Sequence, residues 1–144
     1  MGSIFDEGKD IFNEIESTGK HKLLHDLFLV RTKVWKYHII HDEFGSYGIF
    51  DDITKLDSTL AFELIPTSVE IVANQSDEIF LSTALSLLLT CVEHSNTTEI
   101  PDELLKNWTC INNKVIEFKY KDSTDIWGRI NQWYRIDRQS RPTM

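Results

Sequence analysis

The fold of this chain is decided by residues 77–93, which read DEIFLSTALSLLLTCVE. In a helix of 3.6 residues per turn this stretch is apolar over more than half of its circumference, through Phe80, Leu81, Ala84, Leu85, Leu87, Leu88, Leu89, Cys91 and Val92. A helix that is apolar over most of its surface must be covered on several sides. We therefore predict that residues 77–93 form a helix at the centre of the molecule.

Amphipathic patterns on both sides of this stretch predict further helices. Helical spacing of apolar residues extends over 3–17, 20–37, from 57 to about 73, 101–118 and 123–136. The expected buried stripe of the helix at 101–118 is Leu104, Leu105, Trp108, Ile111, Val115, Ile116 and Phe118. The fold class predicted is all-α, with five or six amphipathic helices around the Leu-rich helix.

Two segments interrupt this pattern. Residues 38–57 mix glycines with aromatic residues, which is typical of an ordered loop or a small hairpin, so an irregular or small β-containing segment is expected there. Pro66 lies inside a helical pattern and is expected to break or kink the helix. For residues 68–73 a strand is an open alternative, because Val69, Ile71 and Val72 favour strands.

Length and composition bound the organisation of the chain. With 144 residues and 41% hydrophobic content, a single domain over 1–144 is expected, with a flexible tail at 138–144. No apolar run approaches the roughly 20 residues of a membrane span, and the N-terminus has no signal-peptide pattern. We therefore expect a cytoplasmic location without membrane binding.

The two cysteines do not predict a disulfide. If the helices at 77–93 and 101–118 pair antiparallel about a turn near Thr97, Cys110 lies about seven residues from the position opposite Cys91. Cys91 also belongs to an apolar helical face and Cys110 to a polar one. Both are expected to be free thiols.

Charged residues are distributed unevenly along this sequence. Between Asp42 and Glu103 there are thirteen acidic residues and one basic residue, Lys55. The later acids flank the predicted helix ends, where carboxylates are favoured by the helix dipole. The earlier acids, from Asp42 to Asp57, have no such explanation and alternate with aromatic residues.

The candidate catalytic and metal-binding groups lack a complete motif. His21 and His25 stand four residues apart, as two ligands of one metal ion can, but no third ligand accompanies them in a known spacing. Cys91 and His94 could form a thiol–imidazole pair, although an apolar setting disfavours a thiolate. Arg31 falls within an apolar helical face, which indicates either a buried ion pair or part of a pocket.

The C-terminal part combines basic and aromatic residues. Its basic residues are Lys119, Lys121, Arg129, Arg135, Arg138 and Arg141. Such a combination can bind nucleic acid, but the aromatic residues follow the buried helical stripe and the net charge of −8 is unfavourable for binding phosphate. We expect this part to pack against the acidic segment of its own fold and to neutralise some of its charge.

Asp42-Glu43-Phe44 and Tyr47-Gly48-Ile49-Phe50-Asp51-Asp52 place acids around aromatic residues. In this feature, and in its small size and acidity, the chain resembles the immunity proteins of bacterial toxin systems, including contact-dependent growth inhibition. The resemblance implies a protein that binds a cognate toxin domain, often a basic nuclease, and blocks its active site. It implies no fold, because immunity proteins have many unrelated folds.

These observations predict a non-enzymatic protein inhibitor that binds a basic protein partner and uses no cofactor. The expected partner-binding residues are Asp42, Glu43, Phe44, Tyr47, Phe50, Asp51, Asp52, Asp57, Glu63 and Glu70. The alternatives are a small helical metal- or ligand-binding enzyme, and an acidic mimic of nucleic acid of the kind that phages encode.

Overall fold

The structure is a computed structural model that describes residues 4–19, 21–36 and 51–135, and only the backbone of residues 4–9, 31–36, 51 and 52. Within these residues it consists of six α-helices and one short 3₁₀ helix, without a strand. The predicted all-α fold class is therefore confirmed. The predicted irregular segment lies mostly outside the described residues, as does the predicted flexible tail.

The helices follow the predicted ranges closely. They are α1 (Ile4–Thr18), α2 (Leu23–Lys36), η1 (Asp51–Lys55), α4 (Ser58–Ala73), α5 (Glu78–Ser95), α6 (Asp102–Phe118) and α7 (Lys121–Tyr134), where η1 is the 3₁₀ helix. None of the described helices is both long enough and apolar enough to cross a membrane.

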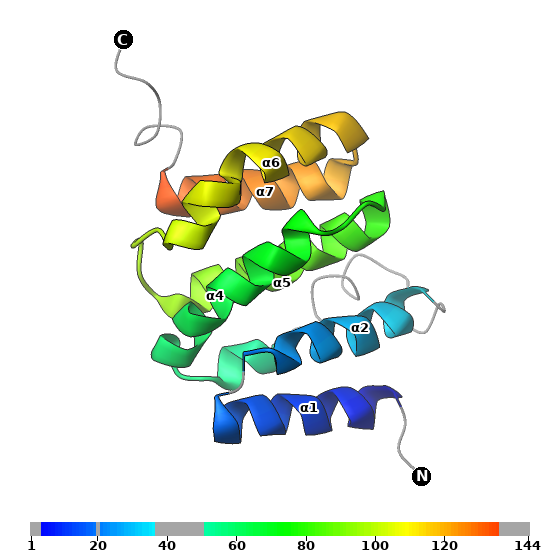
Figure 1. The fold of residues 1–144 in the computed structure, drawn as a ribbon, viewed down its shortest axis with the longest axis vertical. Helices are drawn as coiled ribbons and strands as arrows, with labels where there is room; N and C mark the ends of the chain where they lie inside the picture. Colours follow the sequence, from blue (N-terminus) through cyan, green and yellow to red (C-terminus); the bar gives the residue numbers. More distant parts are fainter. Residues whose placement is uncertain (1–3, 20, 37–50, 136–144) are drawn as a thin grey trace.

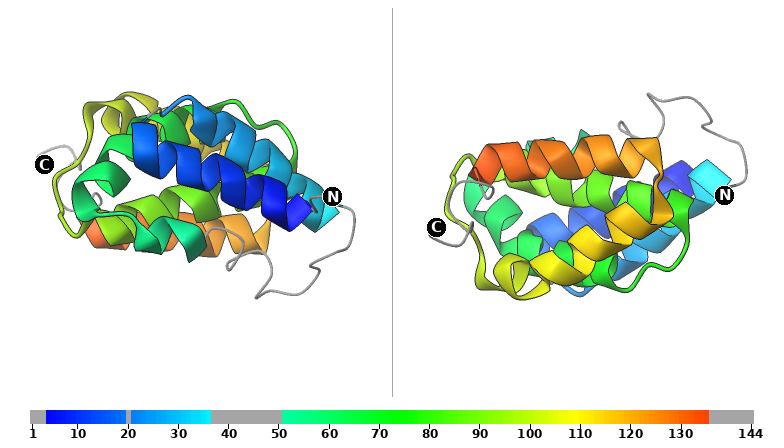
Figure 2. Two further views of the ribbon diagram at one scale, coloured as in Figure 1. Left: turned by 90° about the horizontal axis from the view of Figure 1, so that it is seen from below. Right: turned by 90° about the horizontal axis from the view of Figure 1, so that it is seen from above.

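The helices are stacked in three pairs. Figure 1 shows α1 and α2 at one end of the long axis, α4 and α5 in the middle, and α6 and α7 at the other end. α2 packs on both α4 and α5, whereas α6 covers α4 and α7 covers α5. The two end-on views in Figure 2 show the same pairs, with α6 and α7 diverging over the central layer. The middle pair is thus covered from two sides.

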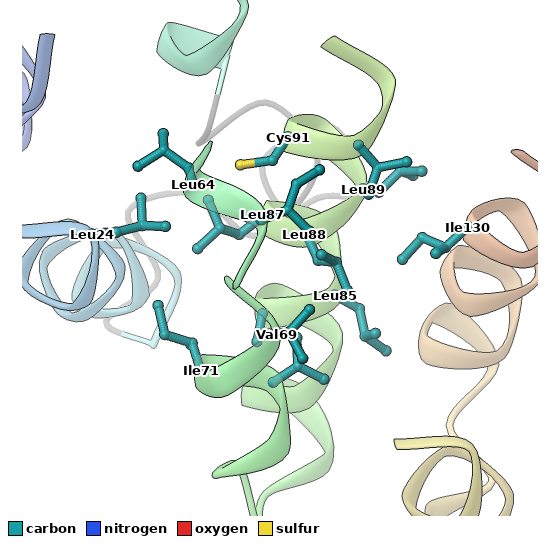
Figure 3. Packing of buried hydrophobic residues seen from close by; sticks show 14 of the residues in the cluster. Leu24, Leu64, Val69, Ile71, Leu85, Leu87, Leu88, Leu89, Cys91 and Ile130 are labelled. Atoms are coloured by element: carbon teal, nitrogen blue, oxygen red, sulfur yellow. The ribbon is translucent and has the colours of Figure 1, made fainter. Parts of the chain in front are cut away.

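α5 is the central helix, as its sequence predicts. Leu81, Ala84, Leu85, Leu87 and Leu88 have no solvent exposure. In Figure 3, Leu24 of α2 lies on one side of the central layer and Ile130 of α7 on the other. Burial of one large apolar side chain stabilises a fold by about 1.5–3 kcal/mol. The α5 face alone therefore accounts for much of the driving force of folding.

Acidic residues stabilise the beginnings of α5 and α6. The carboxylate of Asp77 accepts hydrogen bonds from the backbone N–H groups of Ile79 and Phe80, at 2.9 and 3.1 Å. α6 begins after Pro101, with Asp102 and Glu103 in its first turn. Acidic groups at these positions satisfy free N–H donors or interact favourably with the helix dipole.

α4 decides between the alternatives for residues 57–73. The helix continues through Pro66 to Ala73, so the proline does not break it, and the alternative of a strand at 68–73 is wrong. An internal proline costs about 3 kcal/mol, because it removes one backbone hydrogen bond and crowds the preceding turn. Burial of seven residues offsets this cost: Ala61, Leu64, Ile65, Ser68, Val69, Ile71 and Val72.

α6 corrects two further expectations. It packs on α4 and α7 rather than chiefly on α5, so the antiparallel pairing assumed about Thr97 is wrong. Leu105 and Ile116, expected in the buried stripe, are exposed. Leu104, Ile111 and Val115 supply the buried face, which is narrower than the apolar spacing suggested.

Candidate functional site

Only part of the predicted binding patch falls on described residues. Asp42, Glu43, Phe44, Tyr47 and Phe50 lie outside them. Asp51 and Asp52 belong to η1, where the structure describes the backbone alone. Asp57, Glu63 and Glu70 are described in full and lie on or beside α4, which η1 precedes directly.

Asp57 has a structural role that the sequence analysis did not assign to it. Its side chain caps α4 and accepts a hydrogen bond of 2.8 Å from the backbone N–H of Leu60. The expectation that no acid between 42 and 57 has a local explanation is therefore wrong for this residue. The carboxylate remains exposed, so one oxygen can cap the helix while the group contributes negative charge to the surface.

Glu63 and Glu70 contact two histidines at the start of α2: His21 in the turn before the helix and His25 in its first turn. Nε2 of His21 lies 3.5 Å from Oε2 of Glu63, and Nε2 of His25 lies 3.8 Å from Oε1 of Glu70. Glu63 and Glu70 are seven residues apart on α4, so both lie on the same face of that helix. The histidines that were candidate metal ligands thus lie against α4. Within the described residues, no group of three or more His, Cys, Asp or Glu side chains could hold a metal ion.

A cavity of about 340 Å³ lies where η1, α5 and α7 meet. Its lining residues are Thr54, Ser86, Leu89, Thr90, Glu93, His94 and Arg129. At its rim, the Arg129 guanidinium donates to the Glu93 carboxylate at 3.0 Å. Both side chains are about half exposed, so this ion pair contributes little to stability and its charges remain accessible.

A second cavity, of about 240 Å³, opens beside the start of α4. Ser58, Thr59, Phe62, Ser95, Thr97 and Glu99 line it. The two cavities adjoin the same junction between η1 and α4, because Thr54 lines the first and Ser58 the second. Between these positions the His94 ring hydrogen-bonds the carbonyl of Leu56 through Nε2 and so holds the junction against α5.

We call this part of the molecule the acidic end and define it by the carboxylates of Asp57, Glu93 and Glu99 with the two cavities beside them. All three acidic residues are exposed. In Figure 1 the start of α4 and the end of α5, which carries Glu93, lie on the same side of the molecule. The sequence analysis missed Glu93 and Glu99, because each was attributed to a helix end. Contacts that spacing cannot reveal bring them to this junction: His94, next to Glu93, bonds Leu56, and Glu99 shares a cavity with Ser58.

Cys91 and His94 do not form a thiol–imidazole pair. Cys91 is fully buried, with Sγ 3.5 Å from the Oγ of Ser68, whereas His94 is engaged with Leu56. Burial raises the pKa of the Cys91 thiol to about 12. Cys110 is exposed, and both cysteines are free, as predicted.

Of the C-terminal basic residues, Arg129 is paired with an acid of the acidic segment, Glu93, as expected. Lys114 holds the end of α4 through backbone carbonyls, donating from Nζ to those of Ala73 and Gln75. The tryptophans serve the packing: Trp108, Trp127 and Trp133 each donate from Nε1 to a group within the fold, namely Asn131, Asn112 and the carbonyl of Thr97. The side chain of Arg31 lies outside the described residues.

Comparisons with protein-family models, curated proteins and solved structures find no match to this chain.

Proposed function

We propose that this protein is a non-enzymatic inhibitor that binds and neutralises a basic protein, as immunity proteins do with their cognate toxins. One observation carries the proposal. Glu93 and Glu99 are exposed and line one open cavity each, and the exposed Asp57 stands next to Ser58 of the second cavity, at the junction that directly follows the predicted acidic segment.

Charge and shape have different roles in such a complex. Carboxylates gathered at one end of a molecule attract a basic partner from solution and accelerate its association. Most of the binding energy of an interface comes from a few side chains that fill pockets. The two cavities offer places for such side chains: a basic one would meet Glu99 in the second, whereas in the first it would compete with Arg129 for Glu93.

Glu63 and Glu70 have a secondary part in this proposal. Each already has a histidine neighbour, His21 before α2 or His25 on it, and along α4 the two glutamates lie about 10 Å apart. Their negative charge adds to the long-range attraction, while the direct contacts involve the acidic end.

The test is co-purification of the chain with the product of the neighbouring gene, the first candidate partner for an inhibitor of this kind. A variant with Asp51→Lys and Asp52→Lys raises the net charge of η1 by four units. We expect it to lose most of the partner that the wild-type chain retains at low salt.

A matched control carries Asp10→Lys and Asp125→Lys, two exposed acids on α1 and α7 that change the total charge equally. It is expected to retain the partner. Equal retention by the wild type, the η1 variant and the control would contradict the proposal.

A further inference from the structure

The second cavity, of about 240 Å³, combines hydrogen-bond acceptors with one negative charge. The described residues that line it are Ser58, Thr59, Phe62, Ser95, Thr97 and Glu99. Four of these side chains carry a hydroxyl group, one a carboxylate and one an aromatic ring, and none of the six is basic. The cavity therefore suits a ligand that is positively charged and donates hydrogen bonds.

The hydroxyl group of Ser95 is limited to accepting a hydrogen bond from a ligand. Ser95 is 5% exposed and is the one buried residue among the described lining residues, so it forms the floor of the cavity. Its Oγ donates to the carbonyl of Val92 at 2.6 Å. Because a hydroxyl group has a single hydrogen, the oxygen has only lone pairs left for a further contact.

Glu99 supplies the negative charge of the cavity and is held in place by its loop. It is exposed, and within the described part of the chain no basic side chain lies at ion-pair distance from its carboxylate. Its backbone N–H donates to Oγ1 of Thr97 at 3.2 Å, and the carbonyl of Thr97 accepts from Nε1 of Trp133 at 2.8 Å. A loop fixed in this way loses less conformational freedom when a ligand binds.

The start of α4 does not make this an anion site. A helix N-terminus carries a partial positive charge of about half an elementary charge, which by itself favours an anion. Here the carboxylate of Asp57 caps the helix, with a hydrogen bond of 2.8 Å from the N–H of Leu60. Its full negative charge exceeds that of the helix end, so together with Glu99 it leaves the surroundings of the cavity negative.

Phe62 and the distribution of the acceptors distinguish between the two basic side chains. Phe62 is half-buried and packs against the core, so it provides a fixed apolar wall. Lysine has an apolar stem and an ammonium group whose three N–H donors point in different directions. These donors match acceptors from separate residues, whereas the coplanar donors of arginine match a single carboxylate best.

We propose that the second cavity binds the side chain of a lysine of the basic partner. The stem of the lysine packs on Phe62, and its ammonium group donates to the carboxylate of Glu99 and to Oγ of Ser95. This inference rests on the proposed function and names the residue type that the partner inserts.

NMR spectra of the isotope-labelled full chain, titrated with n-butylammonium, test the cavity without the partner. This probe has the four-carbon stem and the head group of lysine. We expect saturable shifts of backbone amide signals at the lining residues Ser58, Thr59, Ser95, Thr97 and Glu99. n-Butanol, which lacks the charge, should produce no such shifts, and n-propylguanidinium, which resembles arginine, should bind more weakly.

Glu99→Gln removes the charge of the cavity and keeps the size of the side chain. We expect it to weaken binding of n-butylammonium by about tenfold or more, because a hydrogen bond to a charged group is lost. Asp102→Asn is the matched control. It removes the same charge from an exposed acid three residues later that is not among the lining residues, and it should bind the probe as the wild type does.

Equal binding by Glu99→Gln and Asp102→Asn would overturn the proposal, as would n-propylguanidinium binding as tightly as n-butylammonium. The outcome is separable from that of the proposed function. A chain that captures the neighbouring gene product but gives no shifts with n-butylammonium would refute the lysine alone. A chain that binds the probe but captures no basic protein would refute the proposed function, and with it the lysine of a partner.

Discussion

At the scale of single residues, Cys91 and Cys110 show how position determines reactivity. Thiolate is the reactive form of cysteine, and a thiol with a pKa of about 12 is almost entirely protonated at pH 8. Cys91 is also inaccessible in the core, whereas Cys110 is exposed on α6.

We predict that the native protein has one thiol that reacts rapidly with a disulfide reagent at pH 8. Cys110→Ser should abolish the rapid phase, and unfolding in guanidinium should restore one reactive thiol to that variant. Two rapidly reacting thiols in the native wild type would show that the α4–α5 core is open at Cys91.

The residue type of Asp57 does not by itself determine its role. An aspartate before a helix can cap it, bind a partner or do both. The sequence analysis selected Asp57 for its charge, whereas the structure adds its hydrogen bond to Leu60. Binding experiments on this residue therefore need Asp57→Asn, which retains much of the cap and removes the charge, rather than alanine.

At the scale of elements, α4 is stable despite its proline. The cost of Pro66 comes from the missing N–H and from crowding of the preceding turn, and these are properties of one residue. The burial that offsets it comes from the whole inner face of the helix, which packs on α5, α2 and α6.

Pro66→Ala is predicted to raise the free energy of unfolding by about 1–2 kcal/mol. The variant regains a backbone hydrogen bond, but the unfolded chain also gains conformational freedom, which reduces the gain below the full cost of proline. Denaturation in urea measures the difference. A loss of stability would mean that the contacts of the proline ring outweigh its backbone cost.

The elements also show what sequence spacing can predict. Apolar spacing located the helices, because a buried face leaves a period of 3.6 residues in the sequence. It did not identify which face of α6 is covered, because Leu105 and Ile116 fit the same broad apolar arc as Leu104 and Val115. Which face of α6 is buried depends on the tertiary packing, in which α6 contacts α4 and α7.

At the scale of the whole molecule, α5 determines the architecture. Its apolar circumference requires neighbours on several sides, and the structure provides α4, α7 and α2. This arrangement could be predicted from one stretch of sequence. The order of the outer layers could not, because amphipathic helices of similar length fit more than one position around a central helix.

The sequence predicted that the candidate site is acidic, but it did not predict which acidic residues lie together. The acidic segment indicated the region around residues 51–57, and the described part of the fold places Glu93 and Glu99 beside it. Those two residues come from the end of α5 and the following loop, some forty positions later in the chain. Glu63 and Glu70 were correctly expected at the surface, but their contacts with His21 and His25 depend on the packing of α2 against α4.

We propose that the acidic end attracts and binds a basic protein. Electrostatic attraction of this kind acts mainly on the rate of association and weakens as salt screens the charges. The most direct measurement is therefore the association rate constant with the neighbouring gene product, at low and high ionic strength. We predict a fall of at least about tenfold between 0.05 and 0.5 M salt, and a smaller fall for Glu99→Lys. An association rate that is the same at both salt concentrations, or no binding at either, would contradict the claim.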